Sequence, residues 1–370
     1  MTSPGADHPM DDEPYAGPPP MLRPAPGSWQ QAVLRWTPSQ PPAPPLPPPP
    51  EVRWAPPPGT PPHDVPRSYL LAMRSRDWAW WRPLLGLLLL GVVYLVAAVV
   101  VAFLSLATGV GPDLARMDLA DPMTLLVTNL SLIVAIPVVW MAWVVVHGMG
   151  TGWSSSVLAR LRWRLLLPYS LIALATLGAG IGLSALAGFL LGADDVTGPV
   201  ASFGWLLLVV FLTTPLQAAA EEYVFRGYLS QSIAAWVPRP VVGAVVAGVV
   251  TAALFSALHL PPDVPTFLDR FAFGLAASAA AWLTGGLEAA IVLHAVNNVV
   301  VFVLAGALGE GVATEEVPDG SGLVYLLISL LSMAVYLALV ARYRRRLRPE
   351  TRSAALDLRT PGVPVAVAAG

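Results

Sequence analysis

The sequence predicts an all-α fold: a polytopic membrane helical bundle of about eight transmembrane helices, preceded by a disordered, Pro-rich N-terminal tail. Three observations support this prediction. Of the 370 residues, 55% are hydrophobic and only 12% are charged, roughly half the charged fraction of an ordinary soluble domain. The mean hydropathy is +0.64. Apolar stretches of about 20 residues, the length that crosses a bilayer, recur between residues 84 and 341.

Residues 1–66 form a proline-rich segment that holds most of the 39 prolines of the chain. Proline removes backbone hydrogen-bond donors, and the segment offers few apolar side chains to bury. We therefore predict a disordered cytoplasmic tail. Two interpretations of the tail stay open: a docking site for a partner that recognises proline-rich peptides, and a solvated extension.

The short segment 67–83 combines arginines with tryptophans just before the first apolar run. Side chains of these two types gather where a membrane meets water. We predict an interfacial anchor on the cytoplasmic side. Its arginines and tryptophans are Arg67, Arg74, Arg76, Arg82, Trp78, Trp80 and Trp81.

The transmembrane domain is predicted over residues 84–342. A window of about 20 apolar residues selects eight candidate spans. The sixth is the weakest, because Asp269 and Arg270 lie near its start. The spans are 84–107, 123–146, 165–191, 203–232, 240–260, 266–285, 287–308 and 322–341.

The charges between these spans alternate in sign. Arginines follow the second, fourth and eighth spans, whereas aspartates and glutamates follow the first, third and seventh. Arginine-rich loops stay in the cytoplasm, so we predict a multi-pass plasma-membrane protein with both termini cytoplasmic. Residues 343–370 are predicted to be a basic, disordered tail. The formal net charge of −2 argues neither for nor against nucleic-acid binding, but the lack of a basic domain argues against it.

Two adjacent carboxylates and an arginine, Glu221, Glu222 and Arg226, lie inside the fourth predicted span. A charge at the bilayer centre costs roughly 2.5–3.5 kcal/mol on insertion scales, so such groups face a protein interior or a water-filled cavity. Helix residues four apart share a face, so Glu222 and Arg226 are predicted to pair while Glu221 points elsewhere. The pair alone is equally compatible with a structural role.

Histidine and asparagine residues occur in two later spans. His259 shares a helix face with Phe255, and His294 shares one with Asn298, whereas Asn297 lies off it. Each residue alone has a plain structural explanation, as glue between helices, a satisfied core residue or a proton relay. Together, three helices present acid–base and amide groups that suit a bundle interior.

This combination of groups predicts hydrolysis by an activated water. A buried glutamate can remove a proton from water, and imidazole or amide donors can stabilise an oxyanion. Alternatively, a glutamate and two histidines can bind Zn²⁺ and leave a position open for water. The chain has no cysteine and shows no Ser-His-Asp set, so a covalent nucleophile is disfavoured.

Three motifs follow one another on successive predicted spans: E-E-x-x-x-R at 221–226, F-x-x-x-H at 255–259 and H-x-x-x-N at 294–298. Together they resemble the CPBP family of intramembrane proteases, which includes the type II CAAX prenyl endopeptidases and the bacterial Abi proteins. The resemblance covers about residues 165–305, the predicted catalytic core. It implies an all-helical fold of about eight spans, with the active site in a cavity within the membrane.

The resemblance also implies roles for the first two motifs. Glu221 would activate the water, and Glu222 and Arg226 would hold the geometry of their helix. His259 would join Glu221 in positioning water or a metal ion.

In the third motif, His294 and Asn298 would complete the site, with Asn298 as an oxyanion donor. If a metal ion is bound, its ligands would be Glu221, His259 and His294. The family is catalogued as metalloproteases, yet a metal-free glutamate mechanism has also been put forward for it. A divalent metal such as zinc and a metal-free site therefore both stay open.

The predicted function is that of an intramembrane endopeptidase acting on a membrane-associated protein or peptide. In the eukaryotic relatives the substrate is a prenylated CAAX tail, and the resemblance leaves open whether prenylation matters here. A proton- or ion-coupled transporter is one alternative. Another is a non-catalytic scaffold or bacteriocin-immunity protein. The order of the motifs favours the protease.

The chain order sets one geometric requirement. At about 1.5 Å per residue, Glu221 lies deep in a helix that starts near 203, whereas His259 lies at the far end of one that starts near 240. The two side chains meet only if the fourth helix is long and the fifth begins below the membrane plane, or if the spans are tilted or irregular. We expect the boundaries of the fifth span to be the main error.

Overall fold

The computed structural model is built from helices, and the residues it describes contain no strand beyond two isolated β-bridges. The first 64 residues, and with them nearly all of the predicted Pro-rich tail, lie outside the described part, as do most of the predicted acidic loops. The described residues are 65–76, 78–108, 119–190, 196–237, 239–309 and 322–355.

Seven helical segments of this part are long and apolar enough to cross a membrane, which confirms the predicted polytopic helical bundle. Several consist of two helices in line, joined by a kink or a π-helical turn. The helices are α1 (Arg82–Thr108), α2 (Pro122–Ile133), α3 (Ala135–Val145), α4 (Leu166–Ala173), α5 (Ala179–Leu190), α6 (Phe203–Val224), α7 (Ser230–Trp236), α8 (Pro240–Leu258), α9 (Val264–Thr284), α10 (Glu288–Leu308) and α12 (Gly322–Leu347).

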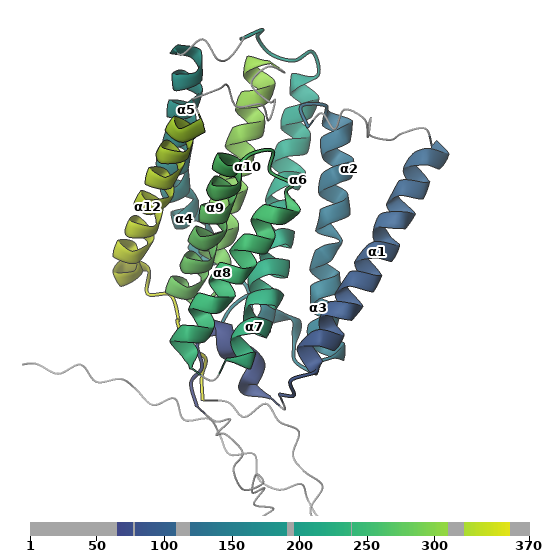
Figure 1. The fold of residues 1–370 in the computed structure, drawn as a ribbon, viewed down its shortest axis with the longest axis vertical. Helices are drawn as coiled ribbons and strands as arrows, with labels where there is room; N and C mark the ends of the chain where they lie inside the picture. The colour runs from purple at the N-terminus through teal and green to yellow at the C-terminus, as the bar shows by residue number, and fades with distance from the viewer. Residues whose placement is uncertain are drawn as a thin grey trace, which may run out of the picture. The chain divides into compact units, whose positions relative to one another are not determined.

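The sixth predicted span corresponds to α9, which is helical but is not among these seven segments. The Asp263 side chain caps its start by accepting the Thr266 N–H at 2.7 Å, and Gly285, with φ of 71°, ends it. The helix packs against α8, α10 and α12, so protein rather than lipid covers much of its surface. Its low hydropathy therefore reflects a helix inside the bundle, and Figure 1 shows it among the other helices.

The fourth predicted span is one continuous helix of 34 residues, Phe203–Trp236, formed by α6, a π-helical turn and α7. At about 1.5 Å per residue it is roughly 51 Å long. The fourth helix is therefore long, as this geometry requires. We expected the boundaries of the fifth span to be in error, and this expectation is wrong. Helix α8 covers Pro240–Leu258, within the predicted 240–260. Figure 1 shows the α8–α9 connection beside the middle of α6, with α6 and α10 continuing past it.

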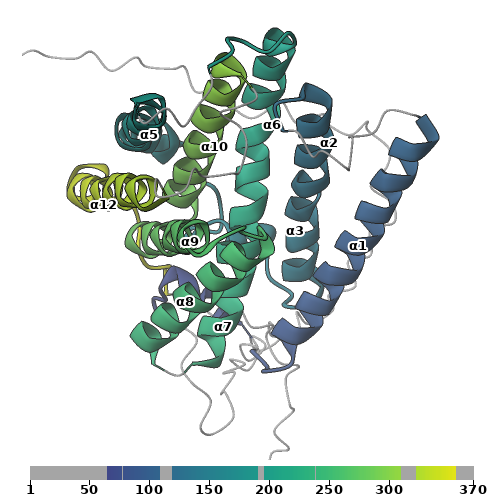
Figure 2. The ribbon, with the colours of Figure 1, turned by 45° about the horizontal axis from the view of Figure 1, so that its top comes forward.

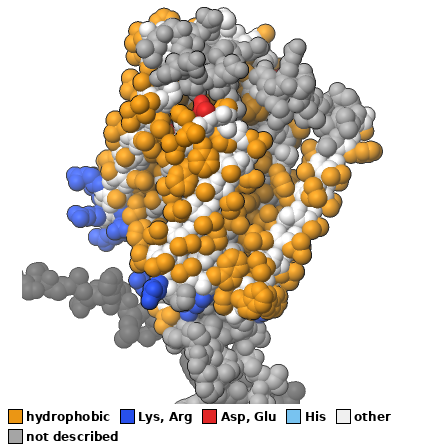
Figure 3. Space-filling model, in the orientation of Figure 1, with side chains coloured by type: hydrophobic (Ala, Val, Ile, Leu, Met, Phe, Trp, Pro, Cys, Tyr) orange, Lys and Arg blue, Asp and Glu red, His pale blue; other side chains and the backbone are white. Residues whose placement is uncertain are grey.

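Helix α6 is central to the packing. It contacts α10 on one side and α2 and α3 on the other, as Figure 2 shows. Helix α1 contacts mainly α3 and is largely exposed. Apolar side chains cover the visible face of the bundle in Figure 3, while arginines gather at one end. This distribution is that of a protein surrounded by lipid, with a basic rim at one interface.

The two ends of the described chain meet at this arginine-rich end. Ser68 forms a β-bridge with Arg352, and Arg164 pairs with Glu350 at 2.9 Å. Arg162, which is buried, binds the buried Glu288 at 2.6 Å. The tail that was predicted to be disordered from residue 343 instead continues helix α12 to Leu347, and beyond this helix Glu350 and Arg352 make the contacts just described.

The predicted interfacial anchor is partly inserted into the bundle. Residues Tyr69–Ser75 form a 3₁₀ helix with most of its side chains buried, and it packs against α7. The Arg74 side chain donates to the Ala235 carbonyl at 2.7 Å, satisfying the end of α7. Only Trp80 and Trp81 project outward as an interfacial anchor would, and they are 64% and 46% exposed.

His147, which follows α3, gives a testable pH dependence of stability. It is buried, and its Nε2 lies 3.0 Å from the Tyr228 hydroxyl. Burial, and then the charge of Arg82, lower its pKa from 6.5 to about 4. Between pH 4 and pH 6.5 the unfolded chain binds more protons at this histidine than the folded chain does. The contribution of neutral His147 to the free energy of unfolding is therefore fully present above pH 6.5, and it is lost as the pH falls toward 4. The loss should be roughly 3 kcal/mol.

Chemical unfolding in detergent across this pH range measures the effect, and His147→Gln provides the comparison. Glutamine keeps a hydrogen-bonding partner for Tyr228 but does not titrate. The variant should lose the wild-type slope between pH 6.5 and 4. An identical slope in both proteins would contradict the assignment to His147.

Candidate active site

The acidic pair lies at the point where α6 changes its winding. Glu221 and Glu222 follow three alanines, whose small side chains let neighbouring helices approach. A π-helical turn, Phe225–Leu229, comes directly after Val224. Such turns add a residue to one helical turn and occur frequently at functional sites. The motif E-E-x-x-x-R thus runs from the α-helical part of α6 into the π-helical turn, where the number of residues per turn changes.

Glu222 and Arg226 form the ion pair predicted from their spacing. Arg226 Nη1 lies 3.0 Å from Glu222 Oε1, and both side chains are fully buried. Arg226 Nη2 also donates to the Gly274 carbonyl of α9 at 2.8 Å. On α10, His294 Nδ1 lies 2.9 Å from the same Glu222 oxygen. The pair therefore ties α6, α9 and α10 together.

Glu221 faces the two histidines. Its Oε2 atom lies 3.7 Å from His294 Nε2 and 3.9 Å from His259 Nε2. This oxygen is buried and has no hydrogen-bond partner among the described residues. His294 is buried, whereas the His259 side chain is 36% exposed. The site is thus enclosed except on the side of the α8–α9 connection. Because α6 is long, it brings Glu221 to the level of His259 and His294.

The hydrogen bonds of the two rings fix which nitrogen carries a proton. His259 Nδ1 lies 2.7 Å from the Phe255 carbonyl oxygen, which can only accept. His294 Nδ1 faces a carboxylate oxygen that already accepts from Arg226. Each neutral ring therefore carries its proton on Nδ1 and presents Nε2 as an acceptor. Two Nε2 atoms and one carboxylate oxygen, all acceptors, converge on one point.

Aromatic rings hold both imidazoles in place. The Phe255 ring centroid lies 4.4 Å from that of His259 and 5.7 Å from that of His294. Phe273, which stacks on Phe255, packs edge-on against His294 at 5.2 Å. The predicted shared face of Phe255 and His259 is therefore found, and the phenylalanine of F-x-x-x-H orients the two histidines through ring packing.

Asn298 reaches Glu221 through a residue that sequence reasoning missed. Its Nδ2 donates to Gln217 Oε1 at 3.2 Å, and Gln217 Nε2 donates to Glu221 Oε1 at 2.5 Å. The available signal was the four-residue spacing of Gln217 and Glu221, which puts both on one helix face. Asn297 lies beside the site and donates to Asn298 Oδ1 at 3.3 Å.

The metal hypothesis for Glu221, His259 and His294 can be tested against this geometry. Each histidine binds an acceptor through Nδ1, an arrangement also found around metal-bound histidines. In the described part of the chain, however, no three His, Asp or Glu side chains are placed so that they could hold a metal ion. As arranged, these three side chains are therefore not spaced as the ligands of one metal ion.

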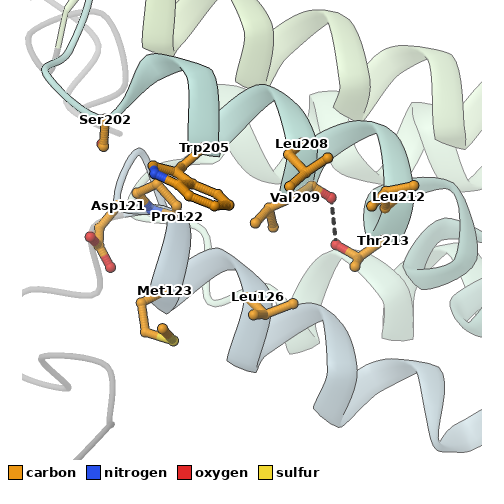
Figure 4. A pocket seen from close by; sticks show the side chains of 10 residues that line it. All are labelled: Asp121, Pro122, Met123, Leu126, Ser202, Trp205, Leu208, Val209, Leu212 and Thr213. Carbon is orange, nitrogen blue, oxygen red and sulfur yellow. Dashed lines mark hydrogen bonds between the residues drawn. The ribbon is translucent and has the colours of Figure 1, made fainter.

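An apolar groove lies away from this cluster. It has a volume of about 520 Å³ and runs between the first halves of α2 and α6, as Figure 4 shows. Its α6 wall runs from Trp205 to Thr213 and includes the exposed Leu208 and Leu212. Thr213 lies two helical turns before Glu221, and no motif residue lines the groove. The groove is therefore an apolar recess on the outer surface of the α2–α6 pair.

Comparison with protein families supports the resemblance suggested by the motifs. Residues 202–300 match the family described as type II CAAX prenyl endopeptidase Rce1-like. This stretch begins just before α6, ends within α10, and contains all three motifs. No curated protein and no solved structure matches the chain. The chain is thus a multi-pass membrane protein that is similar, over residues 202–300, to the Rce1-like type II CAAX prenyl endopeptidases.

Proposed function

We propose that this chain is an intramembrane endopeptidase that cleaves a membrane-associated protein or peptide with a water activated by Glu221. The main support is the convergence of Glu221 Oε2 with the Nε2 atoms of His259 and His294 in the bundle interior. Three acceptors that face one point suit a species that donates hydrogens, and water supplies two. The family of residues 202–300 supports the same reaction class.

In the proposed reaction, water donates one hydrogen to Glu221 Oε2 and the other to a histidine Nε2. Glu221 removes the first proton as the water oxygen attacks the carbonyl carbon of the scissile peptide bond, which gives a tetrahedral oxyanion. Glu221 then passes that proton to the leaving nitrogen, and the C–N bond breaks. The products are one amine and one carboxylic acid, which ionises to a carboxylate by giving the second proton of the water to solvent, and Glu221 is again a carboxylate.

The other motif residues would hold the site for this step. Glu222 binds both His294 Nδ1 and Arg226, which keeps the imidazole oriented while the charge of the glutamate stays paired. Asn298 uses one amide hydrogen on Gln217, and its second hydrogen is the proposed donor to the oxyanion. A preorganised donor of this kind strengthens its interaction as charge develops.

We also propose an orientation, namely that the arginine-rich end faces the cytoplasm from the plasma membrane. Support comes from Arg162 and Arg164, which lie at that end with the segments before α1 and after α12. Both tails would then be cytoplasmic, and a partner of the Pro-rich segment would bind there. The substrate would be a membrane-associated protein or peptide.

A reconstituted assay tests the proposed function. Purified protein in liposomes should cleave a peptide library tethered to the same membrane, and cleavage should persist after treatment with a chelator because the proposed step uses Glu221 as the base and no metal ion. The same vesicles should retain an imposed proton gradient. Dissipation of the gradient without cleavage would contradict the protease in favour of a transporter. Loss of cleavage that added Zn²⁺ restores would contradict the metal-free mechanism.

A further inference from the structure

Gln217 occupies a position that the three motifs do not account for. It lies on α6 one turn before Glu221 and is only 6% exposed. Its amide nitrogen donates to Glu221 Oε1 at 2.5 Å, and its amide oxygen accepts from Asn298 Nδ2 at 3.2 Å. Both ends of this buried amide are therefore used by residues of the proposed catalytic site.

A second buried glutamine shows how a purely structural amide differs. Gln231 on α7 is fully buried and donates to the backbone carbonyls of Trp153 and Gly227, at 3.2 and 3.3 Å. Those bonds join helix α7 to the 3₁₀ helix Thr151–Ser154 and to the turn that precedes α7. Gln217, in contrast, binds side chains alone in the hydrogen bonds of the described residues. Packing of the backbone segments therefore accounts for the hydrogen bonds of Gln231. It does not explain why Gln217 binds the side chains of Glu221 and Asn298.

The chemistry of the partners sets the direction of the Gln217 amide. A carboxylate oxygen can only accept, so the –NH₂ group of the glutamine must face Glu221. Its carbonyl oxygen then faces Asn298, whose –NH₂ group must donate to it. The reverse orientation would place oxygen against oxygen at one end and –NH₂ against –NH₂ at the other. The chain of donors therefore runs from Asn298 through Gln217 to Glu221.

This chain has a consequence for the geometry of the base. Because Gln217 binds Oε1, the other oxygen, Oε2, remains the one that faces His259 and His294. The preceding turn of α6 is itself held from α2, where Asn129 donates to the hydroxyls of Thr213 and Thr214 at 2.8 and 3.1 Å. A neutral amide fixes the carboxylate without adding a charge beside it.

We infer that Gln217 is a positioning residue that fixes the rotamer of Glu221 and the amide of Asn298 relative to each other. The inference rests on the proposed function, in which Glu221 is the general base. Gln217 does not contact the substrate in this account. It selects which oxygen of Glu221 receives the proton and where the free amide hydrogen of Asn298 points.

The test uses full-length protein in liposomes with a membrane-tethered peptide that the wild type cleaves. Gln217→Met keeps the length of the side chain and removes both hydrogen bonds, and Gln231→Met is the matched control. We expect Gln217→Met to lower kcat by about 10- to 100-fold, as misplacement of a reacting group does, with KM within about twofold. Gln231→Met should leave kcat unchanged and lower the unfolding midpoint instead.

Coupling to Asn298 supplies the second measurement. If Gln217 and Asn298 act as one unit, the double variant Gln217→Met/Asn298→Ala should have about the same kcat as the more impaired of the two single variants. Its loss of kcat should not be the product of the two single losses. Multiplicative losses, a wild-type kcat in Gln217→Met, or a kcat loss that matches a loss of folded protein would each overturn the inference. Failure of the wild type to cleave any tethered peptide would instead overturn the proposed function, and the inference with it.

Discussion

Replacing Glu221 by glutamine is expected to lower kcat by about 10²- to 10⁴-fold, the range that a general base contributes. Glutamine has nearly the same shape and can still bind Gln217, but its amide cannot accept the proton of the attacking water. Since Oε2 of Glu221 has no hydrogen-bond partner among the described residues, the substitution leaves no existing bond of that atom unsatisfied. The protein should remain folded. Initial rates of cleavage of a membrane-tethered peptide measure the effect.

The matched control for this variant is Glu350→Gln. Glu350 is also a glutamate, but it lies at the arginine-rich end, where it pairs with Arg164 at 2.9 Å. Burial would raise its pKa, but its own backbone N–H and the charges of Arg164 and Arg162 lower it overall. Glu350→Gln should therefore cleave at the wild-type rate at neutral pH. Equal rates for Glu221→Gln and Glu350→Gln would remove Glu221 from the mechanism.

The second large effect is on stability. Arg226→Met leaves Glu222 buried without its cation, and removing one partner of a buried pair costs about 3–5 kcal/mol. Arg226 also donates to the Gly274 carbonyl, so a link between α6 and α9 is lost with the charge. The free energy of unfolding in detergent should fall by this amount. The exposed counterpart Arg164→Met, whose side chain is 50% exposed, should cost less than about 1 kcal/mol.

A double variant separates the unpaired charge from the lost contacts. In Glu222→Gln/Arg226→Met no buried charge is left alone, and glutamine can still accept from His294 Nδ1. The double variant should therefore be more stable than Arg226→Met by at least about 1 kcal/mol. A double variant less stable than either single variant would show that the pair does not stabilise the protein through charge compensation.

The sequence predicted the helical bundle well because lipid imposes one simple rule, a stretch of about 20 apolar residues for each span. The rule works less well where protein replaces lipid. Helix α9 packs against α8, α10 and α12, so it can be less apolar than the other spans. The ordered segment 348–355 was missed for a related reason. Its order depends on partners far away in sequence, such as Arg162, and these cannot be recognised from the local sequence.

The candidate site was predicted in part for the same physical reason. Ionised groups are rare inside a membrane span, so Glu221, Glu222 and Arg226 could be identified as candidate site residues. The four-residue spacing of Glu222 and Arg226 predicted their ion pair. Gln217 breaks no rule strongly, since a single neutral amide is common glue between membrane helices. Its importance depends on Asn298, 81 positions away in the chain, and only the fold brings the two together.

One measurement tests the central claim most directly, namely that Glu221 activates a water molecule that hydrolyses a peptide bond. Purified wild type and Glu221→Gln, reconstituted in ¹⁸O-labelled water with the same membrane-tethered peptide, are compared by mass spectrometry of the products. The wild type is expected to release a fragment whose new carboxylate carries one solvent oxygen, and Glu221→Gln is expected to release almost none. No fragment from the wild type, or equal labelled fragment from both proteins, would contradict the claim.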